Sequence, residues 1–224
     1  MNLYICSLCC LSLAFATSAE CAVDFRVLNW GGDMSGIYFQ SGGDQMLEIE
    51  AGKRGFSETY SYTGQEPLQL FRQELSEEVG TVSYQPIAVL KPTPNFKTIG
   101  LICFEVPESN QYRLYPLDIG LDALPAGAFC FVNMTTRQLA FQIGESAFYL
   151  ESGQNKKFMN ESSTGIDLDS GGRSIVVRAA EQQSDTWNQV LNVRWMLSSA
   201  ARSFVIVYDN PMGKIAIRRF SDDG

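Results

Sequence analysis

The chain has 224 residues, 45% of them hydrophobic and 19% charged, a composition typical of a globular protein and not of a disordered or collagen-like one. Its 17 Lys and Arg residues against 25 Asp and Glu residues give a net charge of −8, so the broad basic face that nucleic acid requires is not expected. The chain has no histidine, which excludes Ser-His and Cys-His catalytic couples and every His-ligated metal site. We therefore expect a non-enzymatic protein with no catalytic residues, no cofactor and no metal site.

Residues 1–19 predict a secretory signal peptide. They carry no charged side chain, an apolar run covers residues 8–16, and the small residues Thr17, Ser18 and Ala19 follow it. The run is too short for a membrane span, which needs about 20 apolar residues. We therefore expect no membrane span and a secreted or periplasmic location. Lipid attachment at Cys21 stays open as an alternative, although Glu20 stands where lipidation motifs have a small residue.

Three cysteines would remain after cleavage behind Ala19: Cys21, Cys103 and Cys130. In an oxidising compartment one pair could form a disulfide and leave one thiol over, and the sequence leaves open whether and how they pair. Cys103 and Cys130 each lie in an apolar run, which favours small buried hydrophobic residues within strands. No CxxC spacing occurs, so catalytic sulfur is not expected.

Beyond Val23 the chain consists of short runs rich in β-branched and aromatic residues, separated by Gly, Asn, Asp and Pro. These runs predict strands. The first set covers residues 25–29, 36–40, 46–50, 67–72, 83–90, 98–106 and 112–117, and the second covers 128–134, 138–143, 147–151, 174–179, 190–197, 202–208 and 214–219. This density of strands is typical of a sandwich or a barrel.

The two sets also resemble each other. Residues 39–42 correspond to 141–144, residues 50–52 to 151–153, and residues 86–107 align without gaps to 190–211. We therefore predict an all-β chain of two tandem antiparallel β-sandwich domains of immunoglobulin-like type, at residues 20–118 and 125–224, the second being an internal repeat of the first. The segment between them is short and partly apolar, so we expect the domains to pack together. A single larger β-fold is the alternative.

The stretch 185–195 shows both helical and strand spacing. Trp187 and Trp195 fit a helical period, whereas Leu191, Val193 and Trp195 alternate. The repeat aligns this stretch with a predicted strand of the first half, so we predict a strand. Both tryptophans are expected in the core or at the domain interface.

Two aromatic residues are candidate ligand contacts, Trp30 and Tyr38. Sugar-binding β-sandwiches stack ligands on exposed rings, and Trp30 follows the first strand directly before Gly31 and Gly32. The alternative for Trp30 is a ring folded over the edge of the domain.

Two further motifs are weaker. Asp167 and Asp169 precede two glycines, but the spacing of a calcium loop fails, so we predict a turn. The sequons at Asn133 and Asn160 matter only in a glycosylating host, and Asn133, at the end of a strand, is expected to stay unmodified.

The second half resembles uncharacterised secreted bacterial proteins. The resemblance rests on Val132-Asn133, on residues 141–144, on Arg194-Trp195, and on the final apolar strand ending at Tyr208-Asp209. These motifs are structural and cover about half of the chain. The family brings no assigned activity, so the resemblance implies a secreted β-protein and nothing about its ligand.

Two hypotheses on function follow. The first is an exported binding or structural protein of the cell envelope or extracellular space that engages a protein partner through sandwich surfaces or strand edges. The second is a carbohydrate-binding module or a carboxylate-dependent glycosidase, in which two carboxylates would face each other across a cleft. No acidic residue stands in a setting that singles it out.

Overall fold

The computed structural model describes residues 22–64, 67–75, 81–90, 96–106, 108–159, 166–167 and 173–223, and the regular secondary structure of these residues is all β. The predicted signal peptide, Cys21, Asn160 and residues 168–172 lie outside them. The first half contains β1 (Val23–Asn29), β2 (Met34–Gln40), β3 (Met46–Ala51), β4 (Tyr60–Tyr62), β5 (Leu68–Leu75), β6 (Val82–Leu90), β7 (Thr98–Val106) and β8 (Gln111–Asp118). The second half contains β9 (Phe129–Asn133), β10 (Leu139–Ile143), β11 (Ser146–Leu150), β12 (Asn155–Phe158), β13 (Ile166–Asp167), β14 (Arg173–Gln183), β15 (Thr186–Leu197), β16 (Arg202–Asp209) and β17 (Ile215–Asp222).

Every strand predicted from the sequence is present, with ends that differ by a few residues. The ambiguous stretch around Trp187 is a strand, β15, as predicted. The strands β4, β12 and β13 were missed because each is only two to four residues long. Within the described residues, no helix is long and apolar enough to cross a membrane.

The strands form two tandem β-sandwiches, which confirms the predicted fold class. The first sandwich consists of the sheets β4-β1-β7-β8 and β3-β2-β5-β6. The second consists of β12-β9-β16-β17 and of a five-stranded sheet in which β11, β10 and β14 follow in order and β13 and β15 also pair with β14. The strand order of the second sandwich repeats that of the first. Pairing is antiparallel except for β1 with β7 and β9 with β16, which run parallel.

A β-bulge stands at the same place in both sandwiches. In the β5–β6 hairpin the register shifts between Leu70 and Phe71, so that Ile87 is the extra residue. In the β14–β15 hairpin it shifts between Ala179 and Ala180, with Val190 as the extra residue. Each bulge reverses the face to which the next residues of the strand point.

The ladders correct the gap-free alignment of the two halves. Ala88 lies opposite Leu70, and Leu191 lies opposite Ala179, so in β6 and β15 the matching positions are one residue away from the frame expected from the sequence. In the next strands the expected frame is right, because Asn29 pairs with Cys103 as Asn133 pairs with Val207.

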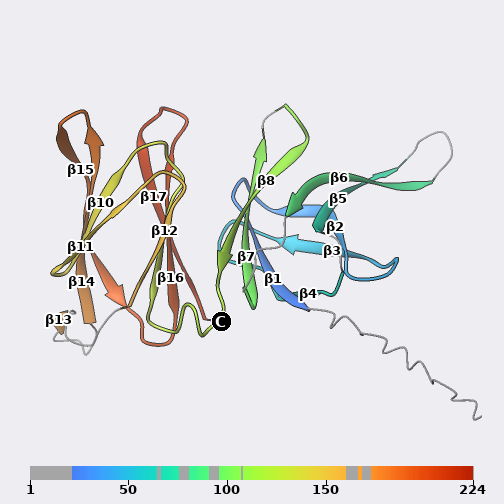
Figure 1. Ribbon diagram of the computed structural model, residues 1–224, viewed down its shortest axis with the longest axis horizontal. Helices are drawn as coiled ribbons and strands as arrows, with labels where there is room; N and C mark the ends of the chain where they lie inside the picture. The colour runs from blue at the N-terminus through green and yellow to red at the C-terminus, as the bar shows by residue number, and fades with distance from the viewer. Residues whose placement is uncertain are drawn as a thin grey trace, which may run out of the picture.

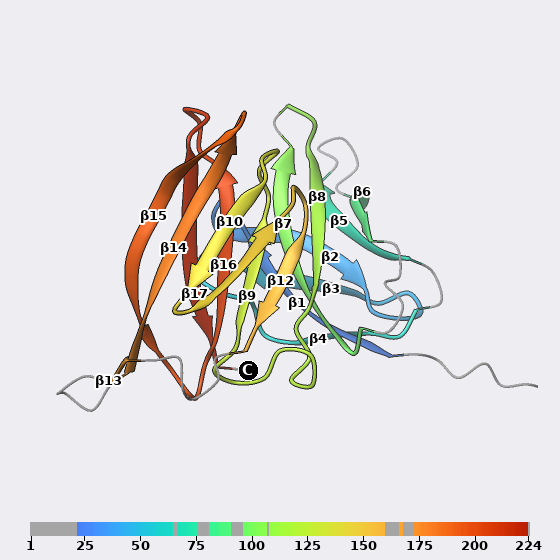
Figure 2. The same ribbon diagram turned by 60° about the vertical axis from the view of Figure 1, so that its left-hand side comes forward.

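The four sheets follow one another along the long axis of the molecule, and the strands of the sheet β3-β2-β5-β6 run across those of the neighbouring sheet (Figure 1). Three apolar layers separate the four sheets. Two of these layers are the cores of the two sandwiches. The third, which we call the middle layer, lies between the domains and includes Leu28, Ile102, Val132 and Ile206. The sheets that contain β1 and β9 therefore have apolar layers on both faces, and the central strands β1, β7, β9 and β16 are buried on both sides. This arrangement explains why β7, β9 and β16 contain continuous apolar runs, whereas β1 also carries Asp24 and Arg26. Figure 2 shows the long β14–β15 hairpin, in orange, on the outer side of the second domain.

Polar contacts hold the middle layer in register. Asp222 accepts hydrogen bonds from Arg26 of the first domain, at 2.8 and 2.9 Å, and from Arg202 of the second. Lys157 also reaches Asp118 across the interface, at 3.1 Å. In the connecting segment, Ile119 and Leu124 are buried in the middle layer, so the domains are packed against each other, as expected.

The two cysteines within the described residues are free and buried. Cys103 faces the first core and Cys130 faces the middle layer. Burial raises the pKa of the Cys103 thiol and of the Cys130 thiol to about 12. At pH 8 the reactive thiolate is therefore about one molecule in ten thousand at each position.

We expect both thiols to be inert in the folded chain. A Cys21→Ser variant of the exported protein should not react with a chromogenic thiol reagent at pH 8 within minutes. After unfolding in guanidinium, two thiols per chain, those of Cys103 and Cys130, should react. Rapid labelling of the folded variant, located by peptide mass spectrometry at Cys103 or Cys130, would contradict the buried positions described above.

Candidate functional site

Trp30 lies between the two domains. Its ring contacts Phe104 and Tyr208, with centroid separations of 5.5 and 4.8 Å, and the guanidinium of Arg218 stacks over it at 5.0 Å. The backbone N–H of Trp30 donates to the carbonyl of Cys103 at 2.9 Å. The indole thus packs at the margin of the middle layer. This position resembles the alternative expected from the sequence, a ring folded over the edge of the domain.

Tyr38 lies elsewhere, on the outer face of the sheet β3-β2-β5-β6. Its ring meets Tyr84 edge-on at 5.2 Å, and its hydroxyl donates to Glu48 at 3.4 Å. Burial, and then the negative charge of Glu48, raise the pKa of Tyr38, so the phenol stays a neutral donor. The structure therefore does not bring the two sequence-predicted contacts together, because Trp30 belongs to the middle layer.

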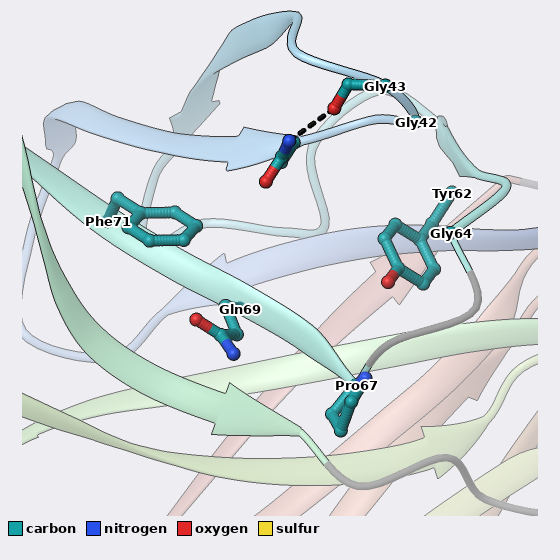
Figure 3. Close-up of a pocket in the computed structure, with 8 residues that line it drawn as sticks. Gly42, Gly43, Tyr62, Gly64, Pro67, Gln69 and Phe71 are labelled. Atoms are coloured by element: carbon teal, nitrogen blue, oxygen red, sulfur yellow. Dashed lines mark hydrogen bonds between the residues drawn. The ribbon is translucent and has the colours of Figure 1, made fainter.

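A shallow pocket of about 270 Å³ opens next to Tyr38 on this outer face. Figure 3 shows the ring of Phe71 and the amide of Gln69 on one strand, with the ring of Tyr62 opposite. The amide of Gln40 donates to the carbonyl of Gly43 at the rim. The described lining residues are Gln40, Gly42, Gly43, Tyr62, Gly64, Pro67, Gln69 and Phe71. None of these carries a carboxylate or an amine, so the lining is suited to neutral polar groups and an apolar ring face.

Exposed apolar side chains extend this surface along the β5–β6 hairpin. Leu75 is 66% exposed, Val82 47% and Tyr84 38%, and Val89 is 54% exposed nearer the pocket. The ladder places Leu75 opposite Val82, and Phe71 opposite Pro86, on the same side of the sheet. We call this surface the N-terminal outer face; its outward side chains include Tyr38, Glu48, Glu50, Phe71, Leu75, Val82, Tyr84 and Val89.

The second sandwich presents a matching surface on its outer sheet. Tyr149 is 65% exposed and Trp187 is 40% exposed, and their ring centroids are 5.5 Å apart. Tyr149 lies on β11 and Trp187 on β15, so β10 and β14 separate them. The outward residues of β10 and β14 between the rings are Ala140 and Ala180, whose short side chains leave room for the contact. We call this surface the C-terminal outer face; its outward side chains include Ala140, Gln142, Tyr149, Arg178, Ala180, Trp187, Arg194 and Met196.

The expectation of a buried Trp187 is wrong, and the bulge is the reason. Leu191, Val193 and Trp195 point into the core, and simple alternation would continue inward through Trp187. Because Val190 is the extra residue of the bulge, Trp187 lies opposite Gln182 on the outer side instead. Trp195 is in the core region as expected, stacked on Phe129 at 6.1 Å.

The bulge of the first sandwich does the same for Tyr84. Ala88 and Leu90 point into the core, but beyond the extra residue Ile87 the side chains of Pro86, Tyr84 and Val82 point outward. Tyr84 lies opposite Gln73, as Trp187 lies opposite Gln182. Each outer face thus carries an aromatic residue that a β-bulge has turned away from the core, which is a use of bulges found next to functional sites.

Sequence reasoning missed Tyr84 and Tyr149 as surface residues. The signal available for Tyr149 was its position next to Phe148, since neighbouring strand residues point to opposite faces and Phe148 packs on the core. For Tyr84 the available signal was Pro86, because a proline within a strand is found at a sheet edge or at a bulge.

The side chain of Asn133 is fully buried, with its amide donating to the carbonyls of Arg137 and Leu150 at 2.7 and 3.0 Å. This burial agrees with the expectation that the first sequon is unmodified in the folded chain. Within the described residues, no three Asp, Glu or Cys side chains lie together in a way that could hold a metal ion.

No protein-family model and no curated protein matches the chain. The resemblance to uncharacterised secreted bacterial proteins therefore stays a prediction, and the functional argument rests on the two outer faces.

Proposed function

We propose that the protein is an exported, non-enzymatic binding protein that engages a protein partner through the N-terminal outer face. The observation that carries this proposal is the outward turn of Tyr84 at a β-bulge, within a row of exposed apolar side chains. An outward Tyr84 adds nothing to the core, and contiguous exposed apolar and aromatic surface is characteristic of protein interfaces. The edge strand β6 borders this face, so a partner strand could also pair with it.

The location is part of the same proposal. The apolar run and small residues before Cys21 support export to a secreted or periplasmic location. Mass spectrometry of the exported species tests it: a mature chain beginning near residue 20 is the expected result, and a chain that retains residues 1–19 in the cytoplasm contradicts it.

The partner is tested by crosslinking in native envelopes or culture fluid. A Leu75→Ser/Tyr84→Ser variant should lose a crosslinked protein that the native chain captures, because the apolar contacts are removed. The matched control is Leu121→Ser, since Leu121 is 64% exposed but lies in the segment between the domains. Equal capture by both variants, or no capture by the native chain, overturns the proposal.

The pocket favours a second candidate, glycan binding. Its lining combines the rings of Tyr62 and Phe71 with the amides of Gln40 and Gln69, a set that suits the apolar face and the hydroxyls of a sugar. Because the described lining residues include no carboxylate, this chemistry favours binding over hydrolysis.

A glycan array separates this candidate from the first. Binding that is lost in Phe71→Ala and Gln69→Ala, which change two lining residues, but kept in Trp30→Ala would support a site at the pocket. A blank array with the native chain, or signals that none of the three variants changes, would end this candidate.

A further inference from the structure

We infer that the partner of the N-terminal outer face is the C-terminal outer face of a second copy of this chain, so that copies associate head to tail. This inference rests on the proposed function, since it names the partner of the same face. It starts from the positions of the two faces, which lie on the outermost sheets at opposite ends of the four-sheet stack (Figure 1).

The charges of the two faces are opposite. Among the described residues of the N-terminal outer face, the charged side chains at outward strand positions are Glu48 and Glu50, both exposed on β3. Among the described residues of the C-terminal outer face, the outward strand positions of β10, β11, β14 and β15 carry two charges, Arg178 and Arg194. The carboxylate of Glu151, directly after β11, already accepts a hydrogen bond from Gln138. A face with two acids and a face with two arginines are electrostatically complementary, which selects the partner and its orientation.

The spacing of these charges also matches. Glu48 and Glu50 are two residues apart on one strand, which places them about 7 Å apart. Arg194 lies opposite Val176, so it is the diagonal neighbour of Arg178 on the next strand, at about 7–8 Å. Arg178 donates to Gln142 at 3.0 Å, which uses one of the five N–H groups of its guanidinium and holds the side chain on this face.

The apolar parts of the faces supply the contact area. The first face offers Tyr38, Phe71 and Tyr84, and the second offers Tyr149, Trp187 and Met196, which is 53% exposed. The chain already contains one contact of this kind, the middle layer, in which two sheets pack face to face with an apolar centre and paired Arg and Asp side chains.

The two faces differ from each other, so the contact is heterologous. One copy buries its N-terminal outer face and leaves its C-terminal outer face open for the next copy. The expected product is an open row of molecules and not a closed dimer.

Sedimentation velocity of the exported chain over a range of concentrations tests the inference. The native chain should form species larger than dimers as its concentration rises. A Glu48→Arg/Glu50→Arg variant and an Arg178→Glu/Arg194→Glu variant should each associate more than about tenfold more weakly, because like charges then face each other. An equimolar mixture of the two variants should restore association, because each reversed face then meets an opposite charge.

The outcomes are distinct. Circular dichroism first establishes that both variants are folded. A native chain that stays monomeric, a dimer that does not grow, or a mixture that fails to restore association overturns head-to-tail assembly. If the chain stays monomeric but still crosslinks a different protein through Leu75 and Tyr84, this inference fails while the proposed function stands; if those substitutions change nothing in either assay, both fail.

Discussion

Replacement of Asp222 by alanine is expected to lower the free energy of unfolding by about 3–5 kcal/mol, the usual cost of removing one partner from a buried ion pair. The Asp222 carboxylate is buried between two guanidiniums, that of Arg26 in the first domain and that of Arg202 in the second. Arg202 is itself buried, and its guanidinium also donates to the backbone carbonyl of Ile119. Without Asp222, two positive charges would face each other in the middle layer.

The measurement is unfolding in urea, followed by circular dichroism, for Asp222→Ala and for a matched control. Asp122→Ala removes the partner of Lys97 in an ion pair whose two side chains are almost fully solvent-exposed, so no measurable change is expected there. Equal midpoints for the two variants would show that the buried triad adds nothing to stability.

The second large effect is expected for Asn133→Ala, at about 3 kcal/mol or more, because several buried groups would lose their partners at once. The side-chain amide of Asn133 donates two hydrogen bonds. Its side-chain oxygen, Oδ1, also accepts one from the backbone N–H of Thr135 at 3.0 Å and one from the Thr135 hydroxyl at 2.8 Å. One side chain thus joins the end of β9, the following loop and the end of β11.

The repeat supplies the control for this prediction. Asn29 occupies the corresponding position at the end of β1 and is also buried, but its side-chain oxygen has no hydrogen-bond partner among the described residues. Asn29→Ala should therefore cost clearly less than Asn133→Ala in the same unfolding experiment. A cost for Asn29→Ala as large as that for Asn133→Ala would mean that the hydrogen bonds of Asn133 are not the source of its contribution.

Much of the fold could be predicted because β-branched and aromatic residues form short runs that Gly, Asn, Asp and Pro separate. The run around Leu101 and the run around Val205 were recognised as strands by their β-branched and apolar residues. Their continuous apolar character also contained information that was not used: strands buried on one face alternate, whereas strands buried on both faces do not. The continuous apolar runs of these strands therefore indicate a second apolar layer, which is the middle layer between the domains.

The outer faces could be predicted only in part. Tyr38 follows from simple alternation in β2, because its neighbours Ile37 and Phe39 point into the core. Tyr84 and Trp187 do not, because a bulge depends on how two strands are paired, and pairing is a long-range property that one strand's residues do not determine by themselves. The glycines after Trp30 suggest an exposed loop, but the residues that cover its ring, Tyr208 and Arg218, belong to the second domain.

The middle layer joins surfaces that correspond to each other in the two repeats. Leu28 and Ile102 of the first domain lie in it together with Val132 and Ile206, which hold the same ladder positions in the second. Contact between like patches is the hallmark of a two-fold symmetric dimer. A chain with only one such domain would expose this apolar patch to solvent. Because both domains belong to one chain here, the contact between the two patches is intramolecular and does not depend on protein concentration.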